Sequence, residues 1–229
     1  MNPLRTVWRK GLKLLLNLTG LTVMSYRHHT MIRDRRLIRR LNDIRIEGRA
    51  LQSLEELINI AGMAKVTEGL GGDVAELGVY RGGTARVIAE NKGSRLFHVF
   101  DSFSGMATAG QDDLHQTGDF GNTSLEDVRE YLREFEGIHF HEGWFPTTTR
   151  GLESARFSFV HLDADLYKST IEALKFFYPR IIPGGILLSH DYNTVSCPGV
   201  AKAFREYFSP GRSLILELGG TTQCLVVKQ

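Results

Sequence analysis

The sequence predicts an α/β protein with a doubly wound, mostly parallel sheet of seven strands and a helical N-terminal extension. Three observations support this fold class. From Asp73 onward, short apolar segments alternate with amphipathic ones, the pattern of a parallel sheet with helices on both faces. A glycine turn separates the first apolar segment from a helical one, as in sheets that bind nucleotides. Two short apolar segments flank Gly219-Gly220 and predict a C-terminal antiparallel hairpin.

Periodicity and turn residues predict the individual elements. The predicted parallel strands are residues 74–79, 96–101, 138–142, 157–163 and 185–190. The predicted helices that connect them are residues 84–92, 124–135, 168–178 and 198–208. The hairpin is expected from Leu214 to Leu218 and from Gln223 to Val227, and an amphipathic helix over residues 51–64.

Composition suits one domain with an appendage. The chain has 229 residues, of which 42% are hydrophobic, enough for a sizeable core. Residues 1–50 hold 12 Lys and Arg against 3 Asp and Glu, whereas the remainder holds 16 against 23. This asymmetry predicts a basic extension over residues 1–50 and an enzyme domain over residues 51–229. Cys197 and Cys224 form no disulfide framework or metal-ligand spacing, which fits a cytoplasmic setting.

The extension contains two kinds of segment. Residues 4–24 are rich in leucine but too short and too interrupted for a transmembrane helix of about 20 residues. They predict a helix that either contacts an anionic membrane peripherally or packs on the body or a second subunit, so a homo-oligomer is expected. Residues 27–49 are rich in arginine, but no aromatic platform or known motif accompanies the charges, so no nucleic-acid partner is expected.

The glycine turn after the first strand predicts a ligand site. Gly78 lets the strand end in a tight turn, and Gly82 and Gly83 allow backbone to approach a ligand closely. Thr84 begins the helix whose N-terminus faces the turn. Tyr80 occupies the middle glycine position of the dinucleotide fingerprint, so that motif is not matched. The carboxylate of Glu76 favours a ligand with a cationic amino or sulfonium group over a pyrophosphate.

The ends of the second and third strands also carry candidate ligand-binding residues. Asp101, followed by Ser102 and Phe103, is placed to accept hydrogen bonds from ribose hydroxyls. Gly143 and Trp144 follow the third strand and are candidates to contact an adenine. Each has a purely structural alternative, because a strand-end aspartate often caps a turn and a tryptophan often packs beneath a loop.

The fourth and fifth strands end in acids and a histidine. Asp163 and Asp191 are expected to lie together, with Asp165 and His190 beside them. Two carboxylates with open positions suit Mg²⁺, whereas the imidazole of His190 suits Mn²⁺, Fe²⁺ or Zn²⁺ better. The alternative is that these acids cap helices or pair with arginines. The predicted metal ligands are therefore Asp163, His190 and Asp191.

Seven motifs, taken in order, resemble the macrocin O-methyltransferase (TylF-type) family over about residues 50–210. They are Ala75-Glu-Leu-Gly-Val-Tyr-Arg-Gly-Gly83, Phe100-Asp-Ser-Phe-Ser-Gly-Met106, Thr123-Ser-Leu-Glu126, Glu142-Gly-Trp-Phe145, His161-Leu-Asp-Ala-Asp-Leu-Tyr167, Tyr178-Pro-Arg-Ile-Ile-Pro-Gly-Gly185 and His190-Asp-Tyr192. The resemblance implies a class I, Rossmann-like methyltransferase that uses S-adenosylmethionine. It also implies Mg²⁺-assisted methyl transfer to a sugar hydroxyl.

The resemblance assigns roles to particular residues. Glu76, Gly78 and Gly82, with Tyr80 and Thr84 beside them, would hold the methionine part of the cofactor. Asp101 would hold the ribose, with Ser102 and Phe103 adjacent, and Gly143 and Trp144 would line the adenine. Asp163 and Asp191 would bind the metal. Members similar to this chain usually carry an aspartate where it has His190, so metal binding is the role that this departure affects.

The chemistry requires a base for the proton of the attacking hydroxyl, and the candidates are Asp191, His190 and Asp165. The acceptor is expected to be a small molecule or glycan, such as a sugar in a glycoconjugate or secondary metabolite. The polar loop over residues 107–122 is expected to act as a lid. Two alternatives stay open: a nicotinamide-dependent oxidoreductase, and a catalytically silent, membrane-docked scaffold that lost its metal through His190.

Overall fold

The computed structural model describes residues 34–111, 113–209 and 214–229. The chain divides into two compact units, Met1–Leu37 and Ile38–Gln229. The predicted helix over residues 4–24, and with it the expected membrane contact, lies outside the described residues.

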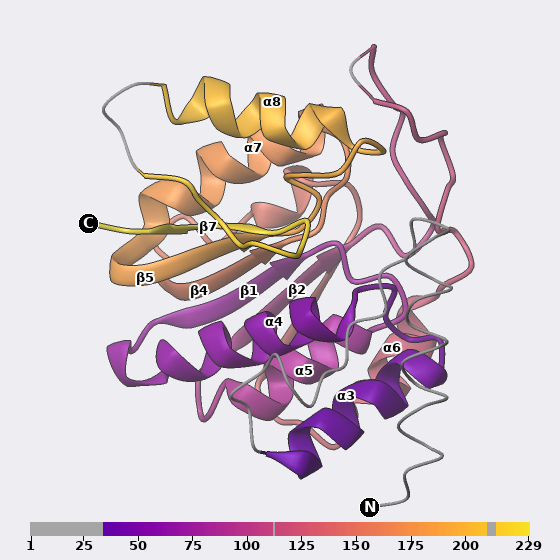
Figure 1. Ribbon diagram of the computed structural model, residues 1–229, viewed down its shortest axis with the longest axis vertical. Helices are drawn as coiled ribbons and strands as arrows, with labels where there is room; N and C mark the ends of the chain where they lie inside the picture. The colour runs from indigo at the N-terminus through magenta and orange to yellow at the C-terminus, as the bar shows by residue number, and fades with distance from the viewer. Residues whose placement is uncertain (1–33, 112, 210–213) are drawn as a thin grey trace, which may run out of the picture. The chain divides into compact units, whose positions relative to one another are not determined.

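A single sheet of seven strands organises this unit (Figure 1). The strands are β1 (Asp73–Leu77), β2 (Phe97–Asp101), β3 (Ile138–Glu142), β4 (Phe157–Leu162), β5 (Ile181–Ser189), β6 (Leu216–Glu217) and β7 (Cys224–Val227). Their order is β3-β2-β1-β4-β5-β7-β6, in which the first five are parallel. β7 pairs antiparallel with both β5 and β6. The structure thus confirms the doubly wound sheet and its closing hairpin.

Helices cover both faces of the sheet, with α4 and α5 on one side and α7 and α8 on the other (Figure 1). The helices are α3 (Arg35–Ile46), α4 (Leu54–Val66), α5 (Gly83–Asn91), α6 (Leu125–Leu132), α7 (Tyr167–Phe177) and α8 (Pro198–Tyr207). Fully buried aromatic residues form the centre of the core, where the ring of Phe177 meets those of Phe100 and Phe157 edge to face. This packing fixes the strand ends on which the site is built.

Local sequence explains where several elements begin. Ser53 and Glu56 form a capping box at the start of α4, in which each side chain accepts a hydrogen bond from the other residue's backbone N–H. β5 starts at Ile181 rather than at the predicted residue 185. Its pairing with β4 shifts register between Phe157 and Phe159, so the Pro-Gly-Gly segment enters the strand as an irregularity instead of forming a turn.

The compact unit begins earlier than the domain boundary expected at residue 50. Leu41 and Ile44 in α3 are fully buried, and the N–H of Gly83 donates to the carbonyl of Arg49 at 3.2 Å. A Cβ on Gly83 would lie 2.6 Å from that carbonyl oxygen, so this segment packs tightly against the start of α5. The residues before 51 therefore include part of the sheet unit.

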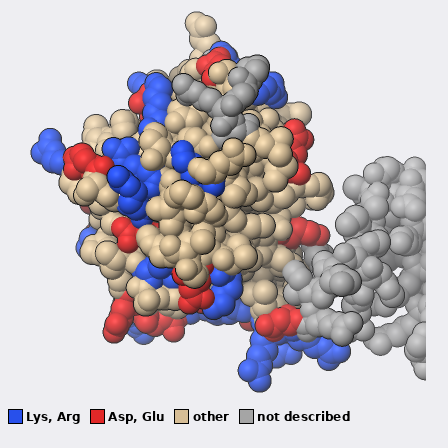
Figure 2. Space-filling view, turned by 90° about the vertical axis from the view of Figure 1, so that its left-hand side faces the viewer, with Lys and Arg blue, Asp and Glu red and all other residues tan. Residues whose placement is uncertain are grey.

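None of the helices in the described part of the chain has the length and apolar character of a membrane span. One face of the molecule carries basic and acidic side chains around a broad uncharged centre, so neither sign dominates it (Figure 2).

Candidate active site

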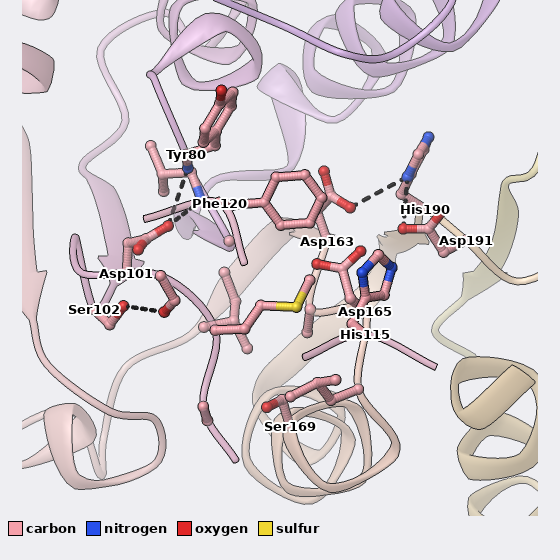
Figure 3. Close-up of a pocket in the computed structure, with 18 of the residues that line it drawn as sticks. Tyr80, Asp101, Ser102, His115, Phe120, Asp163, Asp165, Ser169, His190 and Asp191 are labelled. Atoms are coloured by element: carbon pink, nitrogen blue, oxygen red, sulfur yellow. Dashed lines mark hydrogen bonds and ion pairs between the residues drawn. The ribbon is translucent and has the colours of Figure 1, made fainter. Parts of the chain in front are cut away.

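A cavity of about 310 Å³ opens at the carboxyl ends of β1, β2, β4 and β5. This is the edge at which open parallel sheets bind ligands. Figure 3 shows its two ends: Asp101 and Ser102 lie at one, and Asp163, His190 and Asp191 at the other. Both groups of predicted strand-end residues thus line one cavity.

The glycine turn is shaped by the strand beside it. The N–H of Asp163, at the end of β4, donates to the carbonyl of Leu77 at 2.8 Å. Gly78 follows with φ 86°, and a Cβ there would lie 1.8 Å from the carbonyl oxygen of Asp163. Only glycine fits this position, because both its backbone conformation and its neighbour exclude a side chain.

Asp101 holds the turn with its carboxylate. Oδ2 accepts hydrogen bonds from the backbone N–H groups of Val79 and Tyr80 at 2.6 and 3.0 Å, and Oδ1 accepts one from Phe103 at 2.7 Å. An ionised carboxylate offers about four lone-pair sites. Three are occupied, so the geometry leaves capacity for one ribose hydroxyl rather than the two expected from the sequence.

At the opposite end, His190 lies among three carboxylates. Its Nδ1 is 2.9 Å from Asp191 Oδ2 and 3.2 Å from Asp163 Oδ1, and its Nε2 is 3.4 Å from Glu56 Oε2. Gln52 donates to the other oxygen of Asp163 at 2.6 Å. Nδ1 of His190 has no partner in hydrogen-bond geometry, although it is buried.

Charge in this cluster shifts several pKa values. Burial alone would lower the pKa of His190, but Asp163, Asp191 and Glu56 raise it far above its usual value. Burial alone would raise the pKa of Glu56, but His190 and the N–H groups of Thr222 and Ser53 hold it well below its usual range. The pKa of Asp163 is lowered in the same way by His190. These shifts favour a protonated His190 surrounded by ionised carboxylates whenever no other cation lies among them.

Asp165 differs from its neighbours. Burial and the charges of Asp163 and Asp191 raise the pKa of its carboxyl well above the usual value, and the side chain of Asp191 hydrogen-bonds it. Asp165 (φ 55°) and Asp191 (φ 61°) have left-handed backbone, as do Tyr80 and Phe120 elsewhere on the cavity wall. Such strain in non-glycine residues gathers at functional sites.

Several predicted residues lie on the wall and three do not. Gly78, Tyr80, Thr84, Asp101, Ser102, Gly143, Trp144, Asp163, Asp165, His190 and Asp191 line the cavity. Glu76 lies beneath it, fully buried, with its carboxylate 2.8 Å from Nδ1 of His161. Gly82 precedes α5 as its N-cap, and Phe103 is turned into the core. None of these three residues lines the cavity, and their role in cofactor binding stays a prediction.

The structure also adds residues that the sequence did not single out. Glu56 lies in the first turn of α4 and Gln52 just before that helix, and His115 and Phe120 come from the loop over residues 107–122. The Phe120 ring meets Tyr80 edge to face with centroids 5.7 Å apart, so the loop covers the cavity. A capping-box pattern marks Ser53 and Glu56 in the sequence, but nothing there connects Glu56 to His190.

Comparison with known proteins identifies the family. The family described as "Macrocin-O-methyltransferase (TylF)" matches residues 26–210. The chain belongs to the TylF family. The predicted resemblance is thus confirmed, and a TylF assignment argues against the nicotinamide-dependent alternative.

Two relatives indicate what this TylF chain is similar to. A "8-demethyl-8-(2,3-dimethoxy-alpha-L-rhamnosyl)-tetracenomycin-C 4'-O-methyltransferase" of Streptomyces olivaceus is 32% identical over 61% of this chain and 60% of its own length. A "Demethyldecarbamoylnovobiocin O-methyltransferase" of Streptomyces niveus is 31% identical over 78% of this chain and 67% of its own length. The chain thus spans about three fifths of the first relative and two thirds of the second.

Solved structures confirm the class I O-methyltransferase fold. The O-methyltransferase NovP has a TM-score of 0.64 and 26% identity, over 77% of this chain and 81% of NovP. The calicheamicin methyltransferase CalS11 has a TM-score of 0.67 and 16% identity, over 90% of this chain and 97% of CalS11. The second likeness concerns the fold alone.

Proposed function

We propose that this chain is an S-adenosylmethionine-dependent O-methyltransferase that methylates a sugar hydroxyl in a glycoconjugate or secondary metabolite. The observation that carries the proposal is the single cavity in which a glycine turn and a strand-end aspartate face a cluster of acids and a histidine. Family membership supports it, as do relatives whose names specify O-methylation of glycosylated antibiotics.

The cavity fits the proposed cofactor. Its volume lies at the lower end of the range for small-molecule sites, about 300–1,000 Å³. Asp101 keeps one free acceptor position for a ribose hydroxyl, and the half-exposed indole of Trp144 offers a face for an adenine. The turn at Gly78 and Tyr80 and the residue Asp163 line the same part of the cavity wall, where backbone is available to the methionine part of the cofactor.

The residues present also fit a divalent ion. Ligand atoms of Asp163, His190 and Asp191 all lie within 4.8 Å of one another, and the unpartnered Nδ1 of His190 faces both carboxylates. A set of one nitrogen and two carboxylates suits Mn²⁺, Fe²⁺ or Zn²⁺ at least as well as Mg²⁺. When bound, such an ion supplies positive charge that lowers the pKa of a coordinated hydroxyl.

The protein's own residues then hold and deprotonate the acceptor. Among the three candidate bases, His190 is less suited: the surrounding carboxylates raise its pKa and favour its protonated form, and a bound ion would occupy its Nδ1 instead. Asp165 lines the cavity, and burial and the charges of Asp163 and Asp191 raise the pKa of its carboxyl, the direction that makes a carboxylate a stronger base. We assign proton acceptance to Asp165, with Asp191 holding its orientation through their hydrogen bond.

The test is formation of S-adenosylhomocysteine with a panel of deoxyhexose glycosides and, for comparison, simple phenols. Asp165→Asn should retain cofactor binding and lose turnover by about 10²-fold or more. Glu126→Gln, an exposed residue in the first turn of α6, is the matched control and should behave as the wild type. Methylation of phenols but of no glycoside would contradict the acceptor class, and unchanged turnover in Asp165→Asn would contradict the base.

A further inference from the structure

A second group of metal-ligating side chains lies beside the His190 cluster. His115 comes from the loop over residues 107–122, Asp165 follows β4, and Cys197 immediately precedes α8. Nε2 of His115 is 3.4 Å from Sγ of Cys197, and Oδ1 of Asp165 is 3.7 Å from the same sulfur. Each of the three residues offers a ligand atom within 4.8 Å of the others. Figure 3 shows His115 beside Asp165 in the cavity.

We propose that His115, Asp165 and Cys197 form a site for a soft divalent cation, of which Zn²⁺ is the type. A tetrahedral zinc ion with Zn–S of about 2.3 Å and Zn–N and Zn–O of about 2.0–2.2 Å holds its ligands roughly 3.3–3.7 Å apart. The two distances to the Cys197 sulfur match that spacing. Three protein ligands with the cavity on the open side leave a fourth position for solvent or a small ligand.

The surroundings of the three ligands support the same assignment. Asp119 lies 3.2 Å from Nδ1 of His115, the outer ring nitrogen, and this contact turns Nε2 toward the sulfur. A carboxylate on the outer nitrogen is the usual support of a metal-binding histidine. Cys197 is the N-cap of α8, where the helix dipole favours a thiolate once a cation offsets the neighbouring carboxylates.

The same geometry argues against two other roles of Cys197. Burial and the carboxylates of Asp191 and Asp165 raise the pKa of its thiol to about 12, so without a cation it is a neutral thiol and a poor nucleophile. A disulfide is not formed, because Cys197 and Cys224 are both free. A bound cation balances the charge of the nearby carboxylates and stabilises the thiolate form of Cys197. A role as nucleophile or as disulfide partner does neither.

Occupation of this site has a structural consequence. It joins the covering loop to the body of the protein, where Asp113 already accepts a hydrogen bond from the N–H of Tyr167 at 2.8 Å. It also engages the carboxylate of Asp165 that the proposed function uses as a base. A soft cation here therefore holds the loop on the body and occupies the carboxylate of Asp165. The site itself goes beyond the proposed function and does not depend on it, whereas inhibition of methyl transfer rests on the role proposed for Asp165.

The experiment is a Co²⁺ titration of the full chain, reduced with a reagent that binds no metal, followed by absorption spectroscopy. Cobalt bound to a thiolate gives an intense charge-transfer band in the near ultraviolet, which oxygen and nitrogen ligands do not give. The band is expected to saturate at about one equivalent of thiolate-bound Co²⁺. Addition of Zn²⁺ should displace the Co²⁺ and remove the band. Cys197→Ser should abolish the band and His115→Ala should weaken binding at least tenfold.

Cys224→Ser is the matched control, because Cys224 is buried in β7 and belongs to neither group of candidate ligands. It should keep the band, and so should His190→Gln, which alters the neighbouring cluster only. No cobalt binding, binding without the band, or a band that survives Cys197→Ser would each overturn the proposal. S-adenosylmethionine binding measured on the same samples tests the proposed function separately, since neither result depends on the other.

Discussion

Replacement of His190 by glutamine tests whether this side chain is the cation of its cluster. The imidazole is 14% exposed and has carboxylate oxygens 2.9, 3.2 and 3.4 Å away. Glutamine retains hydrogen-bond donors but carries no charge. His190→Gln therefore leaves the carboxylates of Glu56, Asp163 and Asp191 without their counter-charge.

The loss of stability in His190→Gln should be large. Removing one partner of a buried ion pair costs about 3–5 kcal/mol, because the remaining charge stays buried without compensation. We expect His190→Gln to lower the free energy of unfolding by about this amount near pH 6.5. His139→Gln, on the exposed face of β3, is the control and should change it by less than about 0.5 kcal/mol.

The difference in free energy of unfolding between the wild type and His190→Gln should shrink as the pH rises. The folded-state pKa of His190 is raised above its value of about 6.5 in an unfolded chain. The contribution of His190 to the free energy of unfolding is complete below about pH 6.5. It is lost as pH rises above that value, by up to about 1.4 kcal/mol per pH unit. The wild type should therefore lose stability between about pH 6.5 and 8.5 more steeply than His190→Gln, and the two curves should converge.

Urea unfolding in the presence of a chelator measures both quantities. Equal free energies of unfolding near pH 6.5, or parallel pH profiles for the two proteins, would refute the cationic role of His190. A change in the denaturant slope would indicate instead that the substitution altered the folded or unfolded ensemble.

Three further predictions follow from the same structure. Burial and the neighbouring His98 and His139 lower the pKa of His141 to about 4, so the free energy of unfolding should fall as pH drops from about 6.5 toward 4. In urea unfolding, His141→Gln should show a smaller fall over this range than the wild type, and an identical fall would contradict the prediction. Trp144→Ala should leave stability within about 0.5 kcal/mol of the wild type but weaken cofactor binding by about 1–3 kcal/mol in calorimetry, the cost of one lost base stack. Asp191→Ala should abolish turnover and leave cofactor binding nearly intact; loss of binding would count against its assignment at the metal end.

The sheet could be predicted because its elements are marked locally. β1 and β4 are short, mostly apolar and largely buried segments between polar turns, and their alternation with helices predicts a parallel topology. Strand ends then identify candidate site residues, since parallel strands share one ligand-binding edge. This is why the sequence alone predicts that Asp101, Asp163 and Asp191 lie at one edge of the sheet.

The remaining features depend on tertiary contacts. Glu76 is an acid at the right sequence position, but the alternation of β1 turns it beneath the cavity, where His161 is its partner. Glu56 reaches His190 from a helix far away in the sequence, and His115 reaches Cys197 from a loop. The segment around Arg49 was assigned to the extension because of its charge, although it packs against Gly83.

Calorimetric titration of the protein with S-adenosylmethionine tests the central claim most directly. The account predicts binding of about one equivalent to the wild type and its loss in Gly78→Ala, because a Cβ there would meet the carbonyl of Asp163 at 1.8 Å. Gly219→Ala, where a Cβ meets nothing within 4 Å, should bind as the wild type does. Absence of binding to the wild type, or full binding to a folded Gly78→Ala variant, would contradict the assignment of this cavity to the cofactor.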